Sequence, residues 1–312
     1  MTEDPCAVRI GTLTLGHGHP VGVIGGDDAR WLSLREAHGR AAADEAIAKA
    51  RTEWAGPLLV EPFSAADLPA IAGHADGVVV GAAWMQDFAL VRAAARLGLP
   101  VVVQRGQAAT LEEWLAVVEY CRAEGNDRVV LCESGSRSHL GGVTLDLALL
   151  RAARERSGRP VLAALGEDGS LAAAAVAAGA DGLMLGPGTA GTAAAADEAR
   201  EAATVLAPLV RREEPGCLDA ARGAIDRVDA ALATLLDRRA ALAGTVQRLK
   251  PVGGFRGRDM DRERRLVAAM ARRAPRLGEE LLRPVMNAVI EAGLLLAEEE
   301  RGRPDLGRRG DG

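Results

Sequence analysis

The chain has 312 residues, of which 48% are hydrophobic and 26% charged, so it is long enough for two domains with ordinary cores. Its net charge of −5 and interspersed charges exclude a nucleic-acid-binding surface, and no apolar run reaches the length of a membrane span. We expect a cytoplasmic protein, because the first ten residues do not read as a signal peptide and the four cysteines are scattered as in reduced proteins.

The N-terminal two thirds alternate predicted strands and helices. Residues 9–20 have the pattern of a hairpin with turn glycines, and helices such as Leu111–Ala123 and Leu171–Ala178 separate the later strands. Seven apolar strands are predicted, at Val21–Gly25, Leu58–Glu61, Val78–Gly81, Val101–Gln104, Val129–Glu133, Val161–Leu165 and Leu183–Gly186. Because such strands are typical of parallel sheets covered on both faces, we predict a TIM-like (β/α) barrel, one unit short of eight, over residues 1–212.

Several segments of this region carry a family resemblance. They read RIGTLTLGHGHPVGVIGG, GAAWMQDFALVRA, VVVQRGQAATLEEWLAVVEYCRAEGNDRVVLCESGSR, TLDL and AAGADGLML. Together they resemble type I DAHP synthase, the enzyme that joins phosphoenolpyruvate to erythrose 4-phosphate, over about residues 9–210. The resemblance implies a barrel whose site lies at the C-terminal ends of the strands.

The same resemblance indicates that the synthase chemistry is lost. The family's metal-binding cysteine, histidine and glutamate correspond to Asp27, Glu167 and Gly186, and its last metal ligand has no counterpart. Its substrate-binding lysine and two arginines correspond to Gln104, Ala83 and Ser134. Since a condensation of two anions needs the metal and the phosphate-binding cations, we expect an inactive barrel kept as a scaffold. Arg105, Glu133 and Arg137 survive, and they fit structural ion pairs equally well.

Two further features of the barrel leave alternatives open. Asp27, Asp28 and Glu167 follow predicted strands and suit either a site for a hard metal ion or carboxylates in water, and we predict no metal. The GPGTAGT segment, residues 186–192, suits either an anion-holding loop or a flexible turn before an alanine-rich helix.

The stretch from Leu218 to Lys250 predicts one long helix, about nine turns without proline. Arg239 and Lys250 are eleven residues apart, which returns them to within about 20° of each other on one face. Lys250 is one of only two lysines in the chain, although a cation at a helix C-terminus also suits the helix dipole. Arg222 lies about 25 Å along the axis from Arg239, so it can share a small pocket with Arg239 only from another chain.

Two shorter predicted helices follow, from Asp259 to about Arg273 and from Gly278 to about Glu300. Arg222, IDRVD, LLDRR and Lys250, followed by DMDRE at Asp259–Glu263, resemble the AroQ class of chorismate mutase. We therefore predict a three-helix AroQ-type domain at residues 213–300, and a disordered tail at residues 301–312.

The resemblance implies an intertwined homodimer that rearranges chorismate, a small dianion, to prephenate without a cofactor. Arg239, Lys250 and the partner chain's Arg222 are the implied catalytic residues. Three further positions, which share one face of the predicted second helix, are implied to bind substrate, namely Asp259, Arg262 and Glu263. The two carboxylates equally suit capping of that helix.

The third predicted helix departs from the family at two positions. Gly293 and Ala297 stand where the family has serine and glutamine, and losing one preorganised donor of this kind costs about 2.7–4 kcal/mol in the barrier. Three functions therefore stay open for this domain: a slow chorismate mutase, a mutase for an analogue such as 4-amino-4-deoxychorismate, or a silent chorismate-binding or regulatory protein. A further alternative, against the lost positions of the barrel, is an active DAHP synthase.

Overall fold

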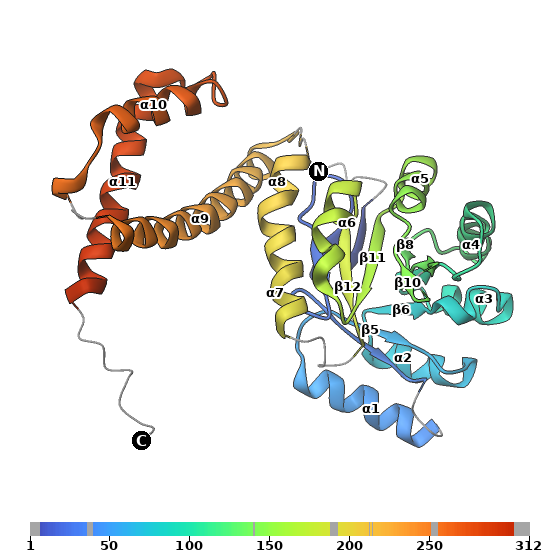
Figure 1. Ribbon diagram of the computed structural model, residues 1–312. Coiled ribbons are helices and arrows are strands. Elements are labelled where there is room, and N and C mark those ends of the chain that lie inside the picture. The colour runs from blue at the N-terminus through green and yellow to red at the C-terminus, as the bar shows by residue number, and fades with distance from the viewer. Residues whose placement is uncertain are drawn as a thin grey trace, which may run out of the picture. The chain divides into compact units, whose positions relative to one another are not determined.

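The computed structural model describes residues 7–35, 40–139, 141–187, 193–211, 213, 215–250 and 255–302. The chain divides into two compact units, residues 1–228 and 229–312 (Figure 1). Helix α9 (Leu218–Leu249) begins in the first unit and ends in the second. The domain boundary predicted after residue 212 stays a prediction, and so does the disordered tail, since residues 303–312 lie outside the described residues.

The first unit is a nearly closed, eight-stranded parallel barrel, as the alternating pattern predicts. The strands run in the order β3-β12-β11-β8-β7-β6-β5-β4, and every neighbouring pair is parallel. All seven predicted strands occur within one residue of their predicted bounds. The eight are β3 (Gly22–Ile24), β4 (Arg30–Ser33), β5 (Leu58–Glu61), β6 (Gly77–Val80), β7 (Val101–Gln104), β8 (Val129–Glu133), β11 (Val161–Gly166) and β12 (Gly182–Leu185).

Helices surround the barrel, as the coloured ribbon shows (Figure 1). They are α1 (Arg40–Glu53), α2 (Leu68–His74), α3 (Phe88–Arg96), α4 (Leu111–Ala123), α5 (Leu147–Ser157), α6 (Ala172–Ala178), α7 (Ala193–Glu201) and α8 (Ala207–Val210). Short 3₁₀ turns are η1 (Ala65–Asp67), η2 (Ala82–Trp84) and η3 (Gly169–Leu171), and a π-helical segment, η4 (Ala202–Leu206), joins α7 to α8. Thr110 and Glu113 form a capping box that starts α4. One core lies between the helices and the strands, and a second fills the barrel.

A hairpin contributes to the inner core. Strands β1 (Val8–Ile10) and β2 (Leu13–Leu15) pair antiparallel, which confirms the predicted hairpin. Val8, Ile10 and Leu15 are buried among the inward-facing side chains of the barrel strands. A second hairpin, β9 (Ser136–Arg137) with β10 (Val143–Thr144), follows β8.

The barrel has eight strands rather than the seven predicted. Relative to eight complete strand–helix units, it lacks the helix between β3 and β4. Only residues 25–29 connect these strands, whereas parallel strands normally need a crossover of a dozen or more residues. Because the connection is so short, the beginning of strand β4 lies next to the end of strand β3. Ile24 and Ala29 form an isolated bridge, and the Gly25 N–H donates to the Ala29 carbonyl at 2.7 Å. Strands β3 and β4 are the two ends of the strand order and share only this isolated bridge, so the barrel is not fully closed between them.

The second unit contains the rest of α9, the turn η5 (Phe255–Gly257), α10 (Met260–Ala271) and α11 (Gly278–Gly302). The three main helices match the prediction of one long helix followed by two shorter ones. Val267 of α10 and Leu282 and Met286 of α11 form a small buried cluster. None of the helices described is long and apolar enough to cross a membrane.

The apolar stripe of α9 is exposed in the single chain. Its members recur at helical spacing, and they are Leu218, Ile225, Val228, Leu232, Leu235, Leu236, Leu242, Val246 and Leu249. A helix face of this length gains stability when apolar surface covers it.

Candidate active site

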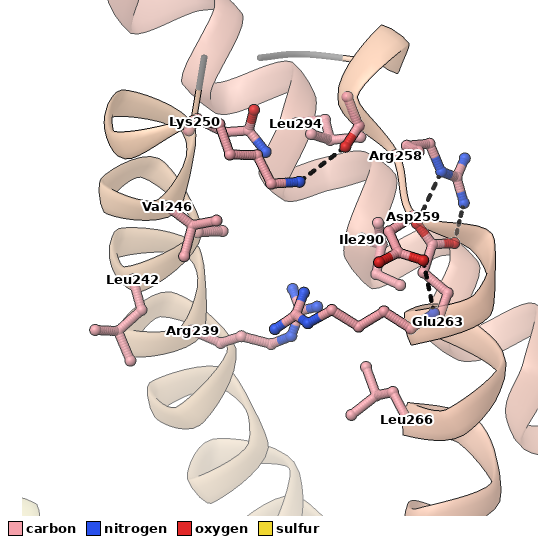
Figure 2. A pocket seen from close by; sticks show the side chains of 14 residues that line it. Arg239, Leu242, Val246, Lys250, Arg258, Asp259, Glu263, Leu266, Ile290 and Leu294 are labelled. Carbon is pink, nitrogen blue, oxygen red and sulfur yellow. Dashed lines mark hydrogen bonds and ion pairs between the residues drawn. The ribbon is translucent and has the colours of Figure 1, made fainter. Parts of the chain in front are cut away.

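A cavity of about 260 Å³ lies in the second unit, where α9, α10 and α11 approach one another (Figure 2). Its volume is close to the lower end for ligand pockets, about 300 Å³, so it suits a small ligand. The cavity is lined by Arg239, Leu242, Ala243, Val246, Gln247, Lys250, Gly257, Arg258, Asp259, Arg262, Glu263, Leu266, Ile290 and Leu294. Five of the six predicted site residues are in this set.

Helix α9 supplies Arg239 and Lys250, which both line the cavity as their eleven-residue spacing predicts. The Lys250 ammonium donates a 2.8 Å hydrogen bond to the carbonyl of Gly257, which, as far as the described residues go, leaves two of its three N–H groups for a ligand. Nη1 of Arg239 donates to the carbonyl of Val289 at 3.3 Å. Protein carbonyls thus hold both cations without neutralising their charge.

The start of α10 supplies Asp259, Arg262 and Glu263. Asp259 is the N-cap, and its Oδ1 accepts a 2.9 Å hydrogen bond from the Arg262 backbone N–H, which lowers the pKa of this carboxyl. Asp259 therefore has the capping role that was weighed against substrate binding, and its side chain still faces the cavity (Figure 2).

Arg258 is a site residue that the sequence reasoning missed. Its Nε and Nη2 donate to the two carboxylate oxygens of Glu263 at 3.0 and 2.7 Å, and its Nη1 donates to Glu291 at 3.3 Å. The only signal in the sequence is an arginine directly before the N-cap, in a loop that also holds Arg256. The apolar lining from Ile290 and Leu294 was also missed, because helical spacing alone does not separate these residues from an ordinary core face.

Neither of the two altered family positions is on the wall of the cavity. Gly293 and Ala297 are both buried on α11. A Cβ on Gly293 would lie 3.4 Å from the Cβ of Ala243 and 3.8 Å from Nη1 of Arg239. Position 293 is therefore one ordinary van der Waals contact away from the residues that form the site.

Arg222 is the one predicted catalytic residue that the single chain does not bring to this cavity. It belongs to the first unit, its side chain is exposed, and it lies 3.7 Å from Asp219 one turn away. This agrees with the sequence argument that Arg222 cannot reach the site of its own chain.

At the C-terminal end of the barrel, the polar side chains bond to one another and to the backbone. Gln104 accepts a 3.2 Å hydrogen bond from the Ala82 N–H, and Ser134 donates to the Arg105 carbonyl. Arg105 makes five hydrogen bonds, to both oxygens of Glu133, to Ser136 and to two backbone carbonyls. Since a guanidinium has five N–H groups, Arg105 has none left for a phosphate. Of the surviving residues, only Arg137 is exposed.

The alternative metal site of the barrel finds no support in the geometry. Asp27 and Asp28 lie 3.1 and 3.7 Å from the guanidinium of Arg200, and Asp28 also accepts from the Val23 N–H at 2.8 Å. Among the described residues, no three His, Cys, Asp or Glu side chains are grouped as a metal site requires. The possible anion loop at residues 186–192 falls largely outside the described residues, which end at residue 187 and resume at 193.

Two family models match the chain. The model described as the DAHP synthetase I family matches residues 42–205, just over half of the chain, and the model described as chorismate mutase type II matches residues 221–298. A curated protein, the phospho-2-dehydro-3-deoxyheptonate aldolase of Thermotoga maritima, is 31% identical over 150 residues. This match covers 45% of the chain, which spans only 44% of that relative's length.

Solved structures give the same relationship for the barrel. The crystal structure of the Thermotoga maritima phospho-2-dehydro-3-deoxyheptonate aldolase (DAHP synthase) superposes with a TM-score of 0.51 and 25% identity, over 57% of this chain and 62% of that one. A truncated form of the 3-deoxy-D-arabino-heptulosonate 7-phosphate synthase of the same organism gives 0.51 and 26%, over 57% and 78%.

Proposed function

Since the chain belongs to the DAHP synthetase I family and carries a chorismate mutase type II domain behind the barrel, we propose that it rearranges chorismate, or an analogue such as 4-amino-4-deoxychorismate, to prephenate or its analogue. The reaction belongs to aromatic biosynthesis. The observation that carries the proposal is the single cavity that gathers Arg239, Lys250, Arg262 and Glu263.

The chemistry of this rearrangement asks little of the side chains except position and charge. One carbon–oxygen bond breaks as one carbon–carbon bond forms within the same molecule, so no nucleophile or proton relay takes part. Catalysis then comes from holding the compact reactive conformer and from stabilising charge that develops on the ether oxygen. Lys250 has two N–H groups available for that oxygen and a carboxylate, and Arg239 keeps donors for the other carboxylate.

We further propose that the site is completed in a homodimer. The apolar face of α9 is exposed over its whole length, and Arg222 does not line the cavity of its own chain. An antiparallel copy of α9 would cover that face, as expected for an isologous interface, and would bring its Arg222 to the cavity.

For the barrel we propose a scaffold without synthase activity. Support comes from the uncharged residues at positions 83, 104, 134 and 186, and from Arg105, whose five donors are all used within the protein. A catalytically silent chorismate-binding or regulatory protein is the second candidate, and the observation that favours it is Ala297 in place of the family glutamine.

The deciding experiment is loss of chorismate absorbance on addition of the purified full chain, with the product identified by mass spectrometry. Formation of prephenate supports the mutase, and binding without turnover supports the silent protein. Phosphoenolpyruvate and erythrose 4-phosphate, supplied with manganese, should remain unconsumed. Turnover that a chelator abolishes and manganese restores would refute the scaffold assignment.

A further inference from the structure

Arg258 and Glu263 form a bidentate ion pair at the N-terminus of α10 (Figure 2). Two parallel N–H···O bonds, at 3.0 and 2.7 Å, join one guanidinium to both oxygens of one carboxylate. This is the strongest geometry for such a pair and fixes the plane of the carboxylate as well as its position. The third contact, to Glu291 on α11, anchors the guanidinium to a second helix.

The pair is part of the cavity wall. Arg258 and Glu263 both line the cavity, and their side chains are only 19% and 12% exposed. Their mutual attraction is therefore screened less than that of the pair formed by Arg264 and Asp261, which is exposed on the same helix and does not line the cavity.

The cavity wall has an excess of positive charge, which suits an anionic ligand. Within one chain four cations, Arg239, Lys250, Arg258 and Arg262, face two carboxylates, Asp259 and Glu263, which gives a net charge of +2 before the proposed partner arginine is added. Within that set Arg258 neutralises Glu263. The Glu263 carboxylate has about four lone-pair sites, of which Arg258 uses two, so it can still accept a hydrogen bond from a ligand.

We infer that Arg258 is a positioning residue that makes the site select a ring hydroxyl over a ring ammonium, an inference that rests on the proposed function. A hydroxyl needs only an oriented acceptor, which the clamped Glu263 provides. An ammonium needs an uncompensated anion, and here it would meet a carboxylate already paired and the Arg258 guanidinium behind it. The excess of cations on the cavity wall suits the two carboxylates of chorismate, whereas a ring ammonium reduces the ligand's charge to −1.

The test compares Arg258→Gln with Arg264→Gln, the matched control from the exposed pair. kcat/KM is measured for chorismate and for 4-amino-4-deoxychorismate. The wild type should prefer chorismate. Arg258→Gln should lower the ratio of kcat/KM for chorismate to kcat/KM for 4-amino-4-deoxychorismate by about tenfold or more, as expected for a bidentate charged contact. Arg264→Gln should leave the ratio in place. A wild type that prefers the amino compound, or an equal loss on both compounds in Arg258→Gln, would overturn the inference.

If the proposed mutase activity is wrong, the measurements give a result that differs from failure of the inference about Arg258. A wild type that rearranges neither compound refutes the mutase, and the ratio of the two Kd values from calorimetry then decides the role of Arg258 by the same criterion. A protein that binds neither compound overturns both. If circular dichroism shows that Arg258→Gln does not fold, Arg258→Lys keeps the charge but loses the bidentate contact, and should lower the ratio by about threefold. An unchanged ratio in a folded Arg258→Lys protein overturns the inference.

Discussion

Arg105 and Glu133 form an ion pair closed to solvent, with only 1% and 0% of their side chains exposed. The pair joins the ends of β7 and β8, and Glu133 also accepts from the backbone N–H groups of Gly135 and Asp146. A pair saturated in this way holds the barrel together. This geometry supports the proposal that Arg105 and Glu133 have a structural role.

The first prediction is that Arg105→Ala destabilises the barrel by about 3–5 kcal/mol, because it leaves a buried carboxylate without its partner. All four tryptophans of the chain lie in the barrel unit, so urea unfolding followed by tryptophan fluorescence reports on that unit. The control is Arg151→Ala, which removes an exposed pair with Glu155 and should cost about 0–1 kcal/mol. Equal losses in the two variants would contradict the structural role.

The strands of the barrel were predictable because each is a short apolar run between turn residues, buried on both faces. Strand β4 was not, because RWLS has one buried large side chain and starts only five residues after β3. Trp31 fills the barrel interior, and its indole N–H donates to the Leu185 carbonyl at 2.7 Å. This contact joins residues 154 positions apart in the sequence, and no local pattern encodes it.

The cations of the candidate site were predictable for a different reason. Arg239 and Lys250 share one helix face, so their approach follows from helical geometry alone. The pairing of Arg258 with Glu263 depends on how the chain enters α10, and the contacts of Gly293 depend on how α11 packs against α9. Neither arrangement follows from spacing within one helix.

The second prediction concerns the proposed dimer. Arg222→Ala and Lys250→Ala should each abolish most mutase activity, and mixing the two proteins should restore about a quarter of the wild-type activity after random exchange. The reason is that one pocket of each mixed dimer then contains both wild-type residues. Absence of recovery, with subunit exchange verified by native mass spectrometry, would show that Arg222 and Lys250 do not serve a shared site.

The third prediction is a pH-dependent stability set by Glu61. This residue ends β5, is only 4% exposed, and its burial raises the pKa of the carboxyl, partly offset by the Ser33 hydroxyl that donates to it. A raised pKa means that the folded state holds the proton more tightly, so stability falls as pH rises above the ordinary value of 4.5. Glu61→Gln removes this cost and should stabilise the barrel most at neutral pH.

Thermal unfolding at pH values from about 5 to 8, followed by tryptophan fluorescence, measures that difference. The advantage of Glu61→Gln should shrink as pH falls toward 4.5. Glu119→Gln, at an exposed carboxylate of α4, is the control and should show no such trend. A difference between Glu61→Gln and the wild type that stays constant with pH would mean that Glu61 does not titrate differently in the folded state.

The last prediction concerns Ala297, where the family has its second donor to the ether oxygen. Ala297 is 5% exposed on α11, and Gly293 one turn earlier carries no side chain to fill the space beside Ala243 and Arg239. If chorismate is the substrate, Ala297→Gln should raise kcat/KM for chorismate by tens- to hundreds-fold, the range of one well-placed donor to a developing oxyanion. Leu295→Gln, at an exposed position of the same helix, should change nothing.

Measuring both variants on chorismate and on 4-amino-4-deoxychorismate separates the three functions that Ala297 leaves open. A slow chorismate mutase gains on chorismate. A site adapted to a differently substituted ring loses turnover of that ring, because the longer side chain crowds it, while chorismate still gains. A silent binding protein acquires little activity on either compound, since one donor cannot restore a pocket whose other residues have diverged. A fall on both compounds would contradict the position of α11 in the proposed site, because a donor there would then obstruct the ligand instead of contacting its ether oxygen.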